Sequence, residues 1–153
     1  MAPEGIVVRS GQAERLPLRT SQVDYLATAK QSKFMSLFEF TVAPGFDTGA
    51  HYHTQIEEFF YVLEGELDLR KGDEMLHAGP GTFVLVTPGT AHFIANRGSK
   101  PARILLGCLP PGHEGYFAEL SALLAKEGPP DAEAIAALRK KYDTIQLSGL
   151  QSK

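Results

Sequence analysis

The chain of 153 residues lacks several features that would point to particular functions. It has one cysteine, Cys108, so no disulfide can form within the chain. Its net charge of −3 gives no electrostatic reason to expect nucleic acid or an anionic membrane as a partner. No apolar run approaches the roughly 20 residues that span a bilayer. The first residues show no basic segment leading into an apolar one, so we expect no signal peptide and a soluble, cytoplasmic protein.

The composition is otherwise that of a folded globular protein. Hydrophobic residues make up 43% of the chain and charged residues 22%, close to the globular average. A chain of about 150 residues buries roughly 70% of its unfolded surface, which is enough for a hydrophobic core. We therefore expect one domain, without internal repeats or low-complexity tracts.

Residues 1–112 alternate short apolar runs with glycine, proline and asparagine, a pattern typical of an all-β sandwich or barrel. Gly65 and the pair Gly72-Asp73 provide residues suited to tight turns. The runs that we expect to be strands are GIVVRS, SKFMSLFEFTV, EEFFYVLEG, ELDLRKG, EMLHA, GTFVLV, AHFIANRG and ARILLGCLP.

Residues 113–153 have a different pattern, which predicts a helical extension packed on the same domain. The segment HEGYFAELSALLAKEG has apolar residues at helical spacing, and Gly128 is a natural stop. In PPDAEAIAALRKKY we expect Asp131 to be the N-cap of a second helix. The segment DTIQLSG adds a last extended piece, and Pro110-Pro111-Gly112 forms a hinge before the helices.

Two of the five histidines stand one residue apart, shortly before two acids, in GAHYHTQIEEFFYVLEG. Alternate residues of a strand point to the same face, so His51 and His53 aim the same way if the segment is extended. Glu58 and Glu57 point to opposite faces. Imidazole nitrogen and carboxylate oxygen suit iron, manganese, nickel, copper or zinc. The alternative is a polar loop beside a core strand.

A second segment, GTFVLVTPGTAHFIANRG, offers His92 as a third imidazole. The two segments resemble the two motifs of the cupin superfamily. The first motif, glycine, His-x-His, glutamate and glycine, is matched at every spacing by Gly45, His51, His53, Glu58 and Gly65. The second is matched by Gly81, Gly89, His92 and Asn96. Its proline has moved from Thr87 to Pro88, a departure that touches no ligand.

The resemblance covers about residues 33–109 and implies a small antiparallel jelly-roll β-barrel with one divalent transition metal inside. The implied ion is Fe, Mn, Ni, Cu or Zn. Glu58 is preferred to Glu57 because six residues then separate it from Gly65, and it is also the candidate catalytic residue. A metal-free relative of the family is the alternative. The implied ligands are His51, His53, Glu58 and His92.

Such a ligand set leaves coordination positions open, which is typical of a catalytic metal. The resemblance favours a quercetinase-like dioxygenase acting on a small enolisable or phenolic molecule. A non-redox isomerase, decarboxylase or lyase and a non-enzymatic ligand-binding barrel remain alternatives. The lack of a helix-turn-helix pattern argues against a transcription factor. Cupins are commonly dimers, so the resemblance also predicts a homodimer.

Several other residues carry weaker expectations. The run FFYVL is apolar on both faces, so we expect both to be covered, the outer one by a partner subunit or by N-terminal strands. Phe60 and Val62 line either the pocket or the plain core, and the core is favoured. We expect Cys108 to be a small buried hydrophobe and His113 to be a polar residue at a helix start, although it could lie near the barrel mouth.

Overall fold

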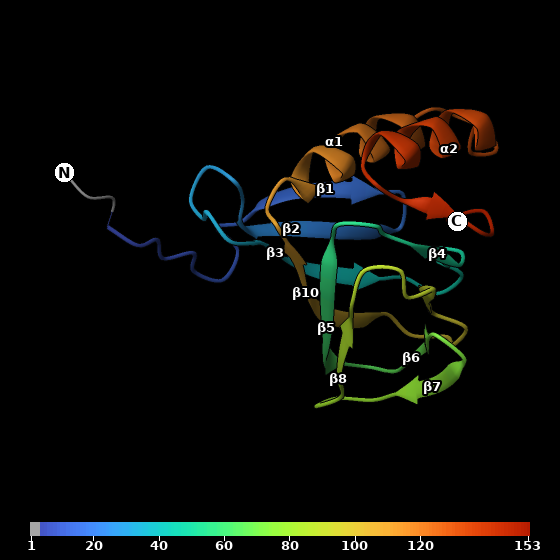
Figure 1. Cartoon of the computed structure of the whole chain (residues 1–153), viewed down its shortest axis with the longest axis horizontal. Coiled ribbons are helices and arrows are strands. Elements are labelled where there is room, and N and C mark those ends of the chain that lie inside the picture. The colour runs from blue at the N-terminus through green and yellow to red at the C-terminus, as the bar shows by residue number, and fades with distance from the viewer. Residues whose placement is uncertain (1–3) are drawn as a thin grey trace.

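The computed structural model describes residues 4–153 as two antiparallel sheets with two helices across one end (Figure 1). The larger sheet has the order β1(Glu14–Leu18), β2(Ser21–Ala27), β3(Ser36–Val42), β10(Ala102–Leu109), β5(Glu57–Glu64) and β8(Phe83–Val86). The smaller has the order β11(Ile145–Gln146), β4(His51–Tyr52), β9(His92–Ala95), β6(Leu67–Lys71) and β7(Glu74–Ala78). The expected jelly-roll barrel with a C-terminal helical part is confirmed.

Alternation of buried and partly exposed residues builds the core between the sheets. In β3, every second residue from Ser36 to Val42 is buried. Phe38 and Phe40 on this strand are at most 2% exposed, as are Leu67 and Leu69 on β6 of the other sheet. The period of two therefore decides which side chains reach the barrel interior, where the histidines and Glu58 also point.

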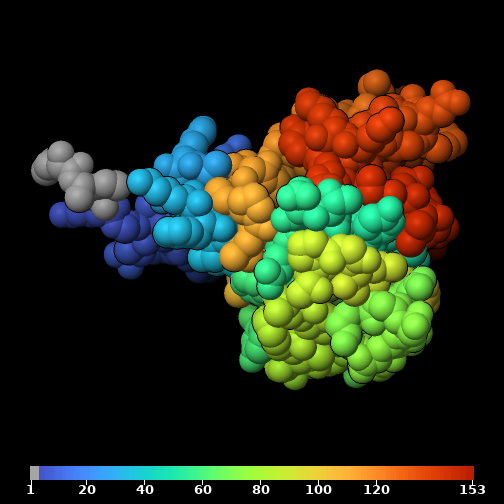
Figure 2. Space-filling model, in the orientation of Figure 1, coloured from blue at the N-terminus to red at the C-terminus, as the bar shows by residue number. Residues whose placement is uncertain are grey.

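The expected strand GIVVRS is wrong. Residues 4–9 have no regular structure, and Val7 is 78% exposed. This segment extends away from the barrel (Figure 2), and it pairs with none of the strands in the two sheets. The true N-terminal strands are β1 and β2, which form a hairpin in which Leu18 and Val23 are completely buried. An apolar triplet alone cannot form a strand, because its backbone groups need a partner.

The run FFYVL is buried on one face only within the single chain, so the alternative that N-terminal strands cover its outer face is wrong, and cover by a partner subunit stays a prediction. Phe60 and Val62 point inward, but Tyr61 and Leu63 are 40% and 38% exposed. The N-terminal hairpin does not cover them, because β1 lies at the opposite edge of the sheet from β8. With Phe83 and Leu85 of β8, they form an exposed apolar surface, the outer β5–β8 face.

The helical extension consists of α1(His113–Leu124) and α2(Ala132–Lys141). Helix α1 ends at Leu124, before the predicted stop at Gly128, whereas Asp131 caps α2 by accepting a hydrogen bond from Ala134 N at 3.0 Å. After α2 the chain returns to the barrel, and β11 pairs with β4, the strand that carries His51. Within residues 4–153, no helix has the length and apolar character needed to cross a membrane.

Candidate metal centre

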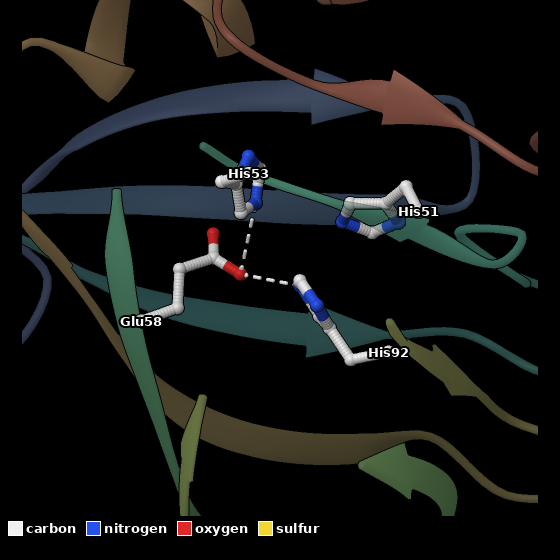
Figure 3. Close-up of side chains that lie close together, drawn as sticks. All are labelled: His51, His53, Glu58 and His92. Carbon is white, nitrogen blue, oxygen red and sulfur yellow. Dashed lines mark hydrogen bonds and ion pairs between the residues drawn. The ribbon is translucent and has the colours of Figure 1, made fainter. Parts of the chain in front are cut away.

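The structure brings the four predicted ligands together in the barrel interior (Figure 3), with one potential ligand atom of each within 4.8 Å of the others. His51 on β4 and His92 on β9 are direct cross-strand partners, and their ring centroids are 4.3 Å apart. Glu58 reaches them from β5 of the opposite sheet, and His53 lies just after β4. All four are at most 8% exposed. Glu57 lies outside this cluster, as strand parity predicts.

Backbone carbonyls fix the orientation of all three imidazoles. The Nδ1 atoms of His51, His53 and His92 lie 2.8, 2.9 and 2.9 Å from the carbonyl oxygens of Gly49, Asp143 and Thr90, respectively. A carbonyl oxygen only accepts hydrogen bonds, so each Nδ1 carries the proton. Each neutral ring then has its lone pair on Nε2, which is the arrangement found in histidines that bind a metal.

The remaining atoms of the cluster are acceptors that face one another without a donor. Glu58 Oε2 is 2.9 Å from His92 Nε2 and 3.4 Å from His53 Nε2. The second contact is close enough for an ion pair, but His53 Nε2 has no aligned hydrogen-bond partner among the described residues. Buried lone pairs and a buried carboxylate at these distances repel unless a cation joins them. The cluster therefore suits a metal ion.

Burial and mutual contact set the charges in the cluster. Burial, together with neighbouring His92, lowers the pKa of His51 to about 3. Burial also disfavours charge on Glu58, yet His53 and His92 hold the pKa of its carboxyl well below the ordinary value. Burial likewise opposes protonation of His53, but the Glu58 carboxylate raises its pKa. The negative charge of Glu58 thus depends on positive charge in the cluster.

Asp143 is a supporting residue that sequence reasoning missed. It lies between α2 and β11 with a φ of 50°, a left-handed conformation that few residues other than glycine adopt readily. Its carbonyl holds His53, and its carboxylate accepts hydrogen bonds from Thr54 N and Oγ1 and from Gln55 N at 2.5–3.0 Å. The helical extension therefore positions a ligand through one residue. Nothing local in the sequence marks it.

Cys108 and His113 also lie beside the cluster. Cys108 is buried as expected, but it is the direct cross-strand partner of Glu58, with Sγ 3.4 Å from Oε1. Burial, together with Glu58, raises the pKa of the thiol well above its ordinary value, so the thiol remains protonated and donates to the carboxylate. His113 is only 6% exposed, and burial lowers its pKa to about 4. His113 does begin helix α1, as expected, but its side chain is buried and lines the cavity, which agrees with the alternative position near the barrel mouth.

A cavity of about 50 Å³ adjoins the cluster. One water needs roughly 10–15 Å³ on this measure, so the space corresponds to about four waters. Phe60 lines the cavity, whereas Val62 belongs to the core alone. Asn96 does not line the cavity; its side-chain amide donates hydrogen bonds to the backbone carbonyls of Val42 and Lys100 at 2.9 and 2.8 Å. The cavity thus has the cluster on one side and largely apolar walls around it.

Comparison with known proteins places the cluster within a matched domain, because residues 38–108 match the cupin domain family. The tetracenomycin polyketide synthase protein TcmJ of Streptomyces glaucescens is 32% identical over 102 residues, which is 67% of this chain. The chain spans 64% of the length of the curated relatives that it matches.

Solved structures share the fold. KdgF from Halomonas sp. superposes with a TM-score of 0.64 at 14% identity and covers 73% of this chain and 99% of its own. The polyketide cyclase RemF of Streptomyces resistomycificus has a TM-score of 0.60 at 24% identity and covers 71% of this chain and 83% of its own. At these identities the likeness concerns the fold alone.

The contacts of Asp143 predict a selective effect on metal affinity. Asp143→Ala keeps the backbone carbonyl that holds His53 but loses the carboxylate that fixes Thr54 and Gln55, the residues just after His53. We expect it to weaken Zn²⁺ binding by about 10-fold, the lower end of the 10- to 100-fold that partners orienting ligating histidines typically contribute. Competition with a chromophoric chelator would measure it. The control is Asp131→Ala, which removes the N-cap of α2 and should cost about 1 kcal/mol in stability without changing zinc affinity. Equal zinc affinity of the Asp143 and Asp131 variants would contradict this role.

Two independent observations agree on the relationship of this chain. The matched domain contains the whole histidine and glutamate cluster, and the solved structures share the two-sheet barrel that holds it. Residues 38–108 match the cupin domain family, and the solved structures share the fold of the barrel that contains this match.

Proposed function

We propose that this chain is a metal-dependent enzyme acting on a small enolisable or phenolic molecule, with a dioxygenase as the favoured class. The observation that supports it is the buried set of three imidazoles and one carboxylate beside a cavity. His51, His53, Glu58 and His92 would hold one divalent ion, Fe, Mn, Ni, Cu or Zn. Bound there, such an ion supplies Lewis-acid or redox chemistry to a substrate in the cavity.

The chain's own residues provide the surroundings that such a reaction needs. The apolar wall that includes Phe60 excludes bulk water, which strengthens electrostatic interactions inside the site. Glu58 Oε2 faces the histidines, whereas Oε1 is contacted by the weakly donating thiol of Cys108. We assign Glu58 the additional role of proton acceptor, because Oε1 is the less engaged of its two oxygens.

The similarity to TcmJ and the volume of the cavity together narrow the range of substrates to consider. TcmJ is named as a polyketide synthase protein, and polyketide chains carry β-dicarbonyl units that enolise readily. The cavity of about 50 Å³, however, is far below the roughly 300–1,000 Å³ typical of pockets for drug-sized ligands. A multi-ring flavonol would need α1 or the C-terminal segment to move. A small enolisable acid fits the space as it stands.

A second candidate is a non-redox isomerase or decarboxylase that uses the ion as a Lewis acid. Solved structures that share the fold include a predicted oxalate decarboxylase and a sugar phosphate isomerase, and these keep this class as a candidate. A non-enzymatic ligand-binding barrel is the third candidate. The absence of turnover with every substrate would support it.

The ligand assignment predicts metal content. Purified protein supplemented with Fe(II), Mn(II), Ni(II), Cu(II) or Zn(II) should retain about one ion per chain, measured by elemental analysis, and His51→Ala or His92→Ala should lose most of it. The matched control is His77→Ala, which removes an exposed histidine of β7 paired with Asp68 and Glu66. Metal content near zero in the parent protein with every supplement would defeat the assignment.

Turnover distinguishes the candidate reactions. With the retained metal, we expect oxygen uptake with small enolisable acids, followed by an oxygen electrode, and little with flavonols because of the cavity volume. Product formation under anaerobic conditions would instead support the non-redox candidate. If metal-loaded protein gives no product with or without oxygen, the enzymatic proposal fails and ligand binding remains.

We also propose that a second copy of the chain covers the outer β5–β8 face. Its four large side chains, Tyr61, Leu63, Phe83 and Leu85, are 38–57% exposed, and contiguous apolar surfaces of this kind often mark interfaces. Sedimentation velocity should therefore give twice the chain mass of 16.6 kDa, and Leu85→Lys should shift the protein toward monomer. A monomeric parent protein at micromolar concentration would contradict the homodimer.

A further inference from the structure

The cavity has a second polar wall, which the helical extension supplies. His113 and Tyr116 come from α1 and Arg139 comes from α2, and all three line the cavity beside the cluster. None belongs to the four-residue cluster, and all lie outside the matched domain at residues 38–108. These groups are therefore additions of the extension that face the same space as the candidate ligands.

Arg139 is buried without an acidic partner. It is 1% exposed, and its hydrogen bonds go to the neutral oxygens of Tyr116, Gln146, Ser148 and Thr48. Arg139 takes part in none of the ion pairs formed within residues 4–153. A buried guanidinium is normally paired with an acid, and the end of α2 offsets only part of its charge. The cavity wall therefore carries positive charge.

Two further groups on this wall lack partners. The Tyr116 oxygen accepts from Arg139 Nε at 3.4 Å, so its own proton is free, and no residue in 4–153 accepts it. The buried Nδ1 of His113 has no hydrogen-bond partner in the same part of the chain. The two side chains are one helical turn apart, with ring centroids separated by 4.9 Å. Buried polar groups are normally satisfied, so the free Tyr116 proton beside the cavity indicates a ligand that accepts a hydrogen bond.

Charge and volume define that ligand. The Glu58 carboxylate is the acidic group that lines the cavity, and it is already engaged by His92 and His53. A divalent ion in the cluster would add to the positive charge of Arg139. The volume of about 50 Å³ admits only a few non-hydrogen atoms. The wall therefore selects for small size and negative charge together.

We propose that His113, Tyr116 and Arg139 form a subsite for the anionic group of a small organic acid. The Tyr116 hydroxyl donates to the anion, Arg139 orients that hydroxyl and supplies the positive charge, and His113 adds a second hydrogen bond. This assignment rests on the proposed function in that it takes the same cavity as the substrate site. It specifies that the substrate carries a carboxylate as well as an enolisable group.

The test compares pyruvate with pyruvamide, an uncharged molecule of nearly the same size. ¹⁵N-labelled protein is titrated with each, both loaded with zinc and after removal of metal by a chelator, and amide shifts give the dissociation constants. We expect pyruvate to bind at least about 10-fold more tightly than pyruvamide, with the shifts centred on α1. Tyr116→Phe, which removes only the hydroxyl, should weaken pyruvate binding by about 10-fold, the scale of a hydrogen bond to a charged group.

Two variants complete the design. Arg139→Gln removes the charge, and circular dichroism checks that it still folds, because Arg139 also ties α2 to the C-terminal segment. If it does not fold, Tyr116→Phe alone decides the outcome. The matched control is Arg97→Gln, an exposed arginine paired with Asp68 on the barrel surface, which should leave pyruvate binding unchanged.

The outcomes separate this inference from the proposed function. Pyruvate preference that depends on Tyr116, in protein that retains no ion from any of the five metal supplements, supports the subsite and refutes the metal function. Zinc binding without a preference for pyruvate supports the metal site and refutes the subsite. No measurable pyruvate binding, equal affinity for the two molecules, or unchanged affinity in Tyr116→Phe each overturns the subsite.

Discussion

Repulsion between buried acceptor atoms is the constraint on which the interior of this barrel depends. Three imidazoles donate their Nδ1 protons to backbone carbonyls, so their Nε2 lone pairs and the Glu58 carboxylate share one buried space. A metal ion, or a proton on one of the imidazoles, removes this repulsion. Both sheets contribute to the cluster, since Glu58 comes from the larger sheet and His51 and His92 from the smaller. The positions of the strands therefore bring the four side chains together, and their charges suit a metal ion.

The helical extension completes this centre in three ways. Asp143 holds His53 and the loop after β4, and β11 pairs with the strand that carries His51. Helices α1 and α2 close the space above the cluster with His113, Tyr116 and Arg139. The matched domain holds the candidate ligands, but the extension decides the size of the cavity and the charge of its far wall. Much of the cavity wall is thus formed by residues that the domain match does not include.

Local patterns in the sequence account for much of the barrel and for the grouping of the four candidate ligands. The i, i+2 spacing of His51 and His53 and the parity that separates Glu58 from Glu57 are properties of a single strand. Such patterns were insufficient where a strand depends on its neighbour. GIVVRS has strand-forming residues but no strand to pair with. The sequence pattern did not predict β1 and β2, which form strands because they pair with each other. The expectation that N-terminal strands cover the outer face of FFYVL was wrong for the same reason, because the exposure of a strand face depends on which elements pack against it.

The sequence by itself determined the strand periodicity, the two motifs and the cap of α2, because each rests on contacts among residues near in the chain. Only the tertiary structure decided that Cys108 lies against Glu58, that Asp143 orients His53, and that Arg139 is buried without an acid beside the cavity. These contacts join residues about 50 to 90 positions apart. Their partners are set by sheet register and by the docking of the helices, which no local pattern encodes.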